Sequence, residues 1–165
     1  DATFPSLQDH STVVSWKAEL KAPLEEILAG LAFAPVLARG NAIRLRIDAV
    51  AFFEGEWWSP LARQKFDIVV SNPPYVAADD PALDDLALQH EPRIALTPGA
   101  DALAALRAIV VGAPKHLRPG AALLLEHGAD QAPAVAELLV AQGFNHVRSH
   151  ADLAGHLRIT EGRRP

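Results

Sequence analysis

The sequence predicts an α/β domain with a largely parallel sheet. From about residue 48 onward, strand-like and helix-like segments alternate, which is the pattern of strands joined by helical crossovers. The segment FDIVVS at 66–71 is rich in β-branched residues, as expected of a strand buried on both faces of a sheet. Half of the 165 residues are hydrophobic, so one domain of this length can bury a core.

The other elements follow in order along this alternating part. Residues 49–55 form a short apolar run with adjacent aromatics, which predicts a strand. Residues 100–117 carry apolar side chains at helical spacing, and this helix should break near Gly112 and Pro114. Residues 118–128 predict a Pro-Gly turn followed by a buried strand.

The C-terminal part predicts one more helix and two strands. The helix covers 131–144, with Pro133 near its first turn and Gly143 just past its end. Residues 145–150 and 156–162 alternate in polarity and predict a closing antiparallel pair near an edge of the sheet.

The first 40 residues have a different character. They contain a possible helix at 24–31, broken by Pro23 and Pro35, and no Gly-rich phosphate or nucleotide loop. Because the chain begins at Asp1 and contains no methionine, we expect it to be a piece of a longer product.

Composition excludes several classes of function. The formal net charge is −5 and no block of Lys or Arg is present, so we expect no direct nucleic-acid partner. The absence of cysteine excludes disulfides, thiolate zinc sites and thiol nucleophiles, and it fits a cytoplasmic location. No apolar run reaches the length of a membrane span and no signal peptide is visible, so no membrane association is expected.

A stiff polar tetrad, Asn72-Pro73-Pro74-Tyr75, directly follows the strand at 66–71. In open α/β sheets, ligands bind beyond the carboxyl ends of the strands. Two consecutive prolines fix φ and lack an N–H, which stiffens the turn and directs the carbonyls of Asn72 and Pro73. The Asn72 side chain adds a further carbonyl and an NH2 group, and Tyr75 offers a ring face.

These groups suit a planar amide or amino nitrogen. Two neighbouring acceptors can hold both hydrogens of an –NH2 group, whose lone pair is delocalised and weakly nucleophilic. Holding it in place favours attack on an electrophile through orientation and through stabilisation of the charge that develops. The simpler alternative is a Pro-rich turn after a core strand with an incidental tyrosine.

The motifs around the tetrad resemble those of one family. Asn-Pro-Pro-Tyr after a strand is a signature of amino-group methyltransferases that use S-adenosylmethionine (SAM), and the flanking segments resemble the release factor glutamine methyltransferases (the HemK/PrmC family). Seven segments recur in the family's order and spacing over roughly residues 38–163: GEWWSPL, FDIVVSNPPYV, DDPAL, HEPRIAL, LRPGAALLLEHG, DQAPAV and DLAGHLRIT.

The resemblance implies a class I, Rossmann-like SAM-dependent methyltransferase sheet with helices on both faces. It implies that Asn72 and the Pro73 carbonyl bind the carboxamide of a glutamine in a peptide chain release factor. Pro74 and Tyr75 would shape the same slot, so the whole tetrad is the predicted catalytic site. Trp57 would lie beside the adenine of SAM, Glu56 takes the place of the usual acidic residue before it, and Asn72 would also contact the cofactor.

Other polar residues of the sequence are further candidates for a function. Glu91 and Arg93 are predicted to order a loop over the substrate, although a surface ion pair is an equal alternative. Glu126 and His127 close the strand at 118–128, and hydrogen bonding within the strand-end loops is a better interpretation than acid/base catalysis. With scattered histidines and no cysteine, no metal site is expected.

The part of the sequence that would bind the cofactor departs from the family's pattern. In the family's strand order, 3-2-1-4-5-7-6, strands 1 and 2 lie between the strand at 49–55 and the strand at 66–71, and no Gly-x-Gly-like loop precedes Asn41. We therefore expect a sheet that is incomplete at strands 1 and 2, with an unpaired edge at 66–71. Residues 1–36 are an atypical segment of unknown role, and 37–165 form a partial catalytic domain.

Two rival functions remain open from the sequence alone. An adenine-N6 nucleic-acid methyltransferase would share the tetrad, although the acidic balance and the EPRIAL and LLLEHG segments speak against it. A catalytically impaired remnant that acts only by binding a protein would explain the missing glycine loop.

Overall fold

The computed structural model describes residues 12–16, 40–41, 43–46, 50–84 and 93–165. The chain divides into two compact units, Asp1–Pro60 and Leu61–Pro165. The predicted helix at 24–31 and the predicted site residue Glu91 lie outside the described residues. Within the described part of the chain, no helix is both long and apolar enough to cross a bilayer.

The first unit contains a two-stranded parallel sheet. Strand β2 (Val50–Glu54) confirms the strand predicted at 49–55, and it pairs with strand β1 (Thr12–Trp16) in a register that runs from Thr12 opposite Val50 to Trp16 opposite Glu54. Strand β1 was not predicted from the sequence. Gly40, Asn41, Ile43 and Arg44 are helical.

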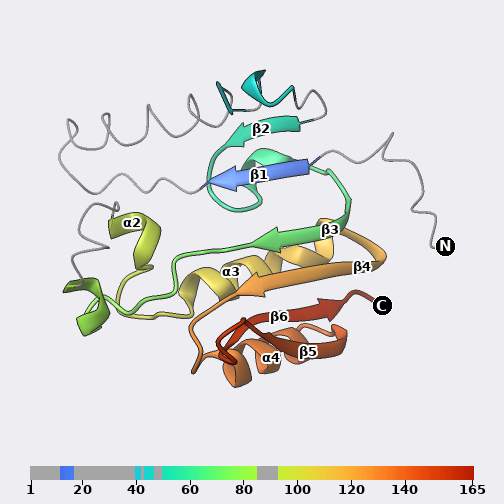
Figure 1. Ribbon diagram of the computed structural model, residues 1–165. Helices are drawn as coiled ribbons and strands as arrows, with labels where there is room; N and C mark the ends of the chain where they lie inside the picture. Colours follow the sequence, from blue (N-terminus) through green and yellow to red (C-terminus); the bar gives the residue numbers. More distant parts are fainter. Residues whose placement is uncertain (1–11, 17–39, 42, 47–49, 85–92) are drawn as a thin grey trace. The chain divides into compact units, whose positions relative to one another are not determined.

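The second unit is built on a four-stranded sheet in the order β3-β4-β6-β5 (Figure 1). Strand β3 (Phe66–Ser71) runs parallel to β4 (Leu117–Glu126), and β6 (Leu157–Arg163) runs antiparallel to both β4 and β5 (Asn145–Ala151). This arrangement is the 4-5-7-6 portion of the predicted order, and it confirms the α/β class and the closing antiparallel pair. Among the described residues, β3 pairs only with β4.

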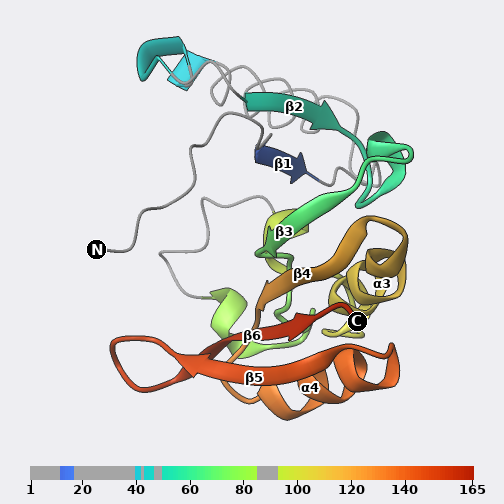
Figure 2. The ribbon, with the colours of Figure 1, turned by 90° about the vertical axis from the view of Figure 1, so that its right-hand side faces the viewer.

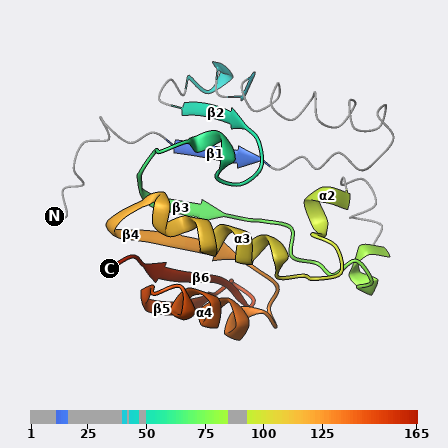
Figure 3. The same ribbon diagram turned by 180° about the vertical axis from the view of Figure 1, so that it is seen from behind.

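Two helices cover one face of this sheet. Helix α3 (Ala104–Gly112) continues into a 3-10 turn, Ala113–Lys115, which confirms the break near Gly112 and Pro114. Helix α4 (Ala132–Ala141) has Pro133 in its first turn. Gly143 follows it with φ of 88°, a left-handed conformation that glycine adopts easily at the end of a helix. In Figures 2 and 3, α3 and α4 lie together on the same side of the strands.

The remaining described elements are short. They are the 3-10 turns η1 (Ser59–Leu61) and η2 (Pro81–Asp84) and the single-turn helix α2 (Arg93–Leu96). The hydrophobic core of the second unit lies between the sheet and helices α3 and α4, where the side chains of Leu106, Leu123, Leu125, Val135 and Leu139 are fully buried. Burial of these apolar side chains stabilises the packing of helices α3 and α4 against the sheet.

The opposite face of the sheet is less covered than predicted. Ile68 is 63% exposed and Val70 is 70% exposed, so the prediction that β3 is buried on both faces is wrong for this side of the strand. The physical reason is the position of the helices, because α3 and α4 both pack on the other face. The strand registers place Val70 in one row with Leu124, Glu161 and Arg148, so this face changes from apolar on β3 to charged on β5.

Candidate active site

The tetrad lies at the carboxyl end of β3, as predicted. Pro73 is buried, Pro74 and Tyr75 are half-buried, and Asn72 is exposed. The Asn72 side chain makes no hydrogen bond with any other described residue. The two prolines of the turn therefore pack against the protein, and the Asn72 carboxamide is accessible to a ligand.

Tyr75 is tied to the end of the neighbouring strand. Its hydroxyl donates a hydrogen bond of 3.3 Å to Oε1 of Glu126, the last residue of β4. Partial burial and then the negative charge of Glu126 raise the pKa of the Tyr75 phenol above its ordinary value. The phenol thus stays protonated at neutral pH and holds its ring at the carboxyl edge of the two parallel strands.

Gln131 joins the same two strand ends through its side-chain amide. Its Nε2 donates to the carbonyl oxygen of Tyr75 at 2.9 Å, and its Oε1 accepts from the backbone N–H of Gly128 at 2.9 Å. Gly128 is closely packed here, because an added Cβ would meet Asp130 Oδ1 at 3.1 Å. Sequence reasoning missed Gln131, and its position just before helix α4, in the loop that follows β4, was the available signal.

The segment after the tetrad runs beside helix α2. The N–H of Val76 donates to the carbonyl of Leu96 at 3.0 Å, and the N–H of Ala78 donates to that of Gly99 at 3.1 Å. Arg93 is the first residue of α2, so the structure brings the backbone of the Arg93 segment to the tetrad loop. The predicted substrate role of Arg93 and Glu91 stays a prediction.

His127 is fully buried and belongs to a chain of hydrogen bonds. Its Nδ1 lies 2.8 Å from the carbonyl oxygen of Gly128 and its Nε2 lies 2.8 Å from Thr160 Oγ1, which is 2.7 Å from Ser149 Oγ. A carbonyl can only accept, so in the neutral ring Nδ1 donates and Nε2 accepts from Thr160. As predicted, Glu126 hydrogen-bonds to the tetrad turn and His127 to the Gly128 carbonyl, whereas the second partner of His127, Thr160, lies within strand β6.

Glu56 and Trp57 lie in the first unit, in the turn that follows β2. Glu56 is exposed, and its carbonyl accepts a hydrogen bond of 2.9 Å from the N–H of Ser59. Trp57 is half-buried and has φ of 46°, a left-handed conformation that is rare for a bulky side chain and is often found at functional sites. Because the tetrad belongs to the second unit, a joint cofactor site with Asn72 stays a prediction.

Among the residues that the structure describes, no three His, Asp or Glu side chains gather where they could hold a metal ion. The polar groups described at the tetrad are amide, phenol, carboxylate and backbone groups. The Asn-Pro-Pro-Tyr turn lies at the carboxyl end of a parallel strand, which is where the resemblance to amino-group methyltransferases predicts the site.

Comparison with known proteins narrows the class. No family model matches the chain. A release factor glutamine methyltransferase of Burkholderia pseudomallei is 50% identical over 135 residues, which cover 78% of this chain and 47% of that protein. The corresponding protein of Xylella fastidiosa (strain Temecula1) is 46% identical over 129 residues, with the same two coverages. Over the shared part, this chain is a relative of the release factor glutamine methyltransferases.

The chain spans about half the length of the curated relatives that it matches. A release factor glutamine methyltransferase of Bordetella pertussis is 43% identical over 157 residues, which cover 92% of this chain and 57% of that protein, so this alignment extends into residues 1–36. A solved protein-(glutamine-N5) methyltransferase from Alicyclobacillus acidocaldarius covers 71% of this chain at 24% identity with a TM-score of 0.42, and no conclusion rests on that similarity.

Proposed function

We propose that this chain takes part in the transfer of a methyl group from SAM to the side-chain amide nitrogen (N5) of a glutamine in a peptide chain release factor. The observation that carries the proposal is the tetrad: an exposed carboxamide on a rigid turn, held at the carboxyl edge of the sheet by Tyr75, Glu126 and Gln131. The similarity to release factor glutamine methyltransferases supports the choice of substrate.

In this proposal the tetrad binds and orients the substrate amide. The Asn72 side-chain carbonyl and the Pro73 backbone carbonyl accept the two hydrogens of the glutamine NH2 group, which directs the nitrogen lone pair away from the turn. As the nitrogen forms its new bond to carbon it becomes positively charged, and the two carbonyl dipoles stabilise that charge. One N–H proton then leaves to solvent.

SAM would supply a methyl group on a positively charged sulfur, which departs with the electron pair of the broken C–S bond. The residues present fit only part of this cofactor. The half-buried indole of Trp57 suits the adenine ring and the exposed Glu56 carboxylate suits a hydroxyl or amino group, whereas the sequence has no Gly-x-Gly-like loop before Asn41 for the amino-acid end. We therefore expect weaker SAM binding than a complete site would give.

The test combines binding and transfer. SAM is titrated into the purified chain by calorimetry, and methylation of a bacterial release factor is followed with SAM labelled in its methyl group. Asn72→Ala should lower transfer by about 100-fold or more, the scale seen when a preorganised polar group is removed from a catalytic site. Because Asn72 is exposed, the Asn72→Ala variant should keep the fold of the unmodified chain. Gln142→Ala removes an exposed amide beyond helix α4 and serves as the control.

Each outcome bears on one part of the proposal. Absence of detectable SAM binding would refute independent activity of this chain and favour a catalytically impaired remnant that acts only by binding a protein. Transfer to adenine in DNA but not to the release factor would favour the nucleic-acid alternative. Transfer that survives Asn72→Ala would refute the role of the tetrad.

A further inference from the structure

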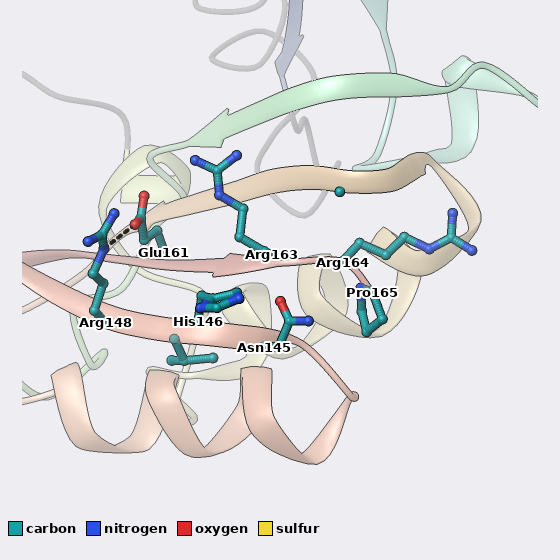
Figure 4. A pocket seen from close by; sticks show the side chains of 9 residues that line it. Asn145, His146, Arg148, Glu161, Arg163, Arg164 and Pro165 are labelled. Atoms are coloured by element: carbon teal, nitrogen blue, oxygen red, sulfur yellow. Dashed lines mark hydrogen bonds and ion pairs between the residues drawn. The ribbon is translucent and has the colours of Figure 1, made fainter.

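A second polar site lies on strands β4, β6 and β5, and none of the tetrad residues lines it. Strands β3 and β4 end at the tetrad and at Glu126, whereas a pocket of about 650 Å³ borders Gly120, close to the start of β4. The start of β5 and the end of β6 form the rest of its wall. Figure 4 shows Arg148, Glu161 and Arg163 on the side of the sheet that faces away from helix α4.

Arginine side chains are concentrated in the wall of the pocket, although the formal net charge of the chain is −5. Arg148, Arg163 and Arg164 all line it, and Glu161 is the only acidic residue in its wall among the described residues. Glu161 is ion-paired with Arg148 through that arginine's Nε, and its side chain is only 10% exposed. The pair holds the Arg148 guanidinium in place and leaves its two terminal nitrogens available to a further acceptor.

The other two arginines differ in how they are held. Arg164 donates from its guanidinium to the carbonyl of Leu117, and its backbone N–H donates to Ala121 at 2.9 Å, which fixes it against β4. Arg163 is exposed and forms no ion pair with any described residue. The pocket therefore combines two positioned guanidinium groups with one that is free to bind a ligand.

The backbone of β5 is distorted at this pocket. The pairing of β5 with β6 shifts register between Asn145 and Arg148, and His146 within the shift has φ of 50°. A bulge of this kind redirects side chains, and a left-handed conformation at a non-glycine residue is a strain that often accompanies function. The bulge brings Asn145 and His146 into the pocket wall, where both can donate hydrogen bonds (Figure 4).

We infer that this pocket binds a phosphorylated small molecule through its phosphate group. Guanidinium groups match the geometry of phosphate oxygens, and Arg148 and Arg163 extend from the same side of the sheet (Figure 4). The three guanidinium groups in the wall outnumber its two carboxylates, the Glu161 side chain and the C-terminus at Pro165, so the wall favours an anion. The volume lies within the range of small-molecule sites. A nucleic-acid backbone fits less well, because it needs an extended basic surface and this positive charge is local. The site is separate from the tetrad, so its ligand does not compete with the proposed methyl transfer.

Calorimetric titration of the full chain with inorganic pyrophosphate, at fixed low ionic strength in a chloride buffer, tests the inference. We expect saturable binding at one site, weakened about tenfold or more by Arg163→Ala. Arg163→Gln, which keeps much of the aliphatic stem, is a second variant in case the first does not fold. Arg118→Ala is the matched control, because Arg118 is also exposed on this sheet but pairs with Asp67 at 2.6 Å outside the pocket.

Three results would overturn the inference: no saturable binding of pyrophosphate, an equal loss of binding in Arg118→Ala, or binding of single-stranded RNA that pyrophosphate does not displace. A parallel SAM titration separates this site from the proposed activity, since Arg163→Ala should leave SAM binding unchanged.

Discussion

Replacing Glu126 by glutamine should make Tyr75 easier to ionise. The phenol oxygen of Tyr75 lies 3.3 Å from Glu126 Oε1, so ionisation would place two negative charges at that separation. Even at the dielectric constant of water, their repulsion is about 1.3 kcal/mol. Glu126→Gln keeps the shape and removes the charge. The ratio of phenolate to phenol at a fixed alkaline pH should therefore rise roughly eightfold.

The assay is simple because Tyr75 is the only tyrosine in the chain. The ultraviolet absorbance of the phenolate in an alkaline titration reports on this residue alone, and circular dichroism at each pH shows whether the fold persists. Glu137→Gln, which makes the same change in charge on an exposed position of helix α4, is the control. Equal phenolate fractions in Glu126→Gln and the unmodified chain would show that Tyr75 and Glu126 are not in contact in solution.

The same contact predicts how stability changes with pH. Because the pKa of Tyr75 is raised in the folded chain, the unfolded state loses its phenol proton first. The contribution of Tyr75 to stability is therefore complete below the ordinary pKa of tyrosine and is lost as the pH rises through the folded value.

Three further predictions concern stability and use urea unfolding. Gln131→Ala should lower the free energy of unfolding by about 1–3 kcal/mol, because it leaves the Gly128 N–H and the Tyr75 carbonyl without this partner; a change as small as that of Gln142→Ala would contradict the bridge. The hydrogen bond from Arg148 lowers the pKa of Glu161, so the stability that this pair contributes is present above the ordinary glutamate pKa and is lost as the pH falls. In Glu161→Gln the free energy of unfolding should therefore depend less on pH in the acid range, and an unchanged dependence would contradict the pairing. Leu139→Ala, at a fully buried position of α4, should cost about 2–5 kcal/mol, whereas Val140→Ala, at a position that is 61% exposed, should cost much less; equal costs would show that α4 packs through a different face.

The residue types and their spacing within each segment predicted the secondary structure of the second unit well. The β-branched run at 66–71 gave the bounds of β3, and the apolar spacing between Pro133 and Gly143 predicted helix α4. These elements follow from short-range preferences: β-branched side chains favour strands, and Pro and Gly mark helix ends. The position of the tetrad followed equally directly, because the carboxyl end of a parallel strand is where α/β sheets bind ligands.

Features that depend on distant parts of the chain were not predictable in this way. Gln131 contacts the carbonyl of Tyr75 across 56 positions of sequence. Its place before helix α4 marks it as a candidate, but no local pattern identifies Tyr75 as its partner. The exposure of Ile68 and Val70 was missed because an apolar run indicates what a strand can bury, and says nothing about whether a second layer covers it. Strand β1 was missed because its pairing with β2 joins segments that lie far apart in the sequence.

The division of the chain into two units separates its intrinsic fluorophores. All three tryptophans, Trp16, Trp57 and Trp58, belong to Asp1–Pro60, and the single tyrosine belongs to Leu61–Pro165. Tryptophan emission during denaturation therefore follows the first unit, and the tyrosine signal follows the second, in one unlabelled sample. Coincident transitions would mean that the two units melt as one cooperative block, and separate transitions would give each unit its own free energy of unfolding.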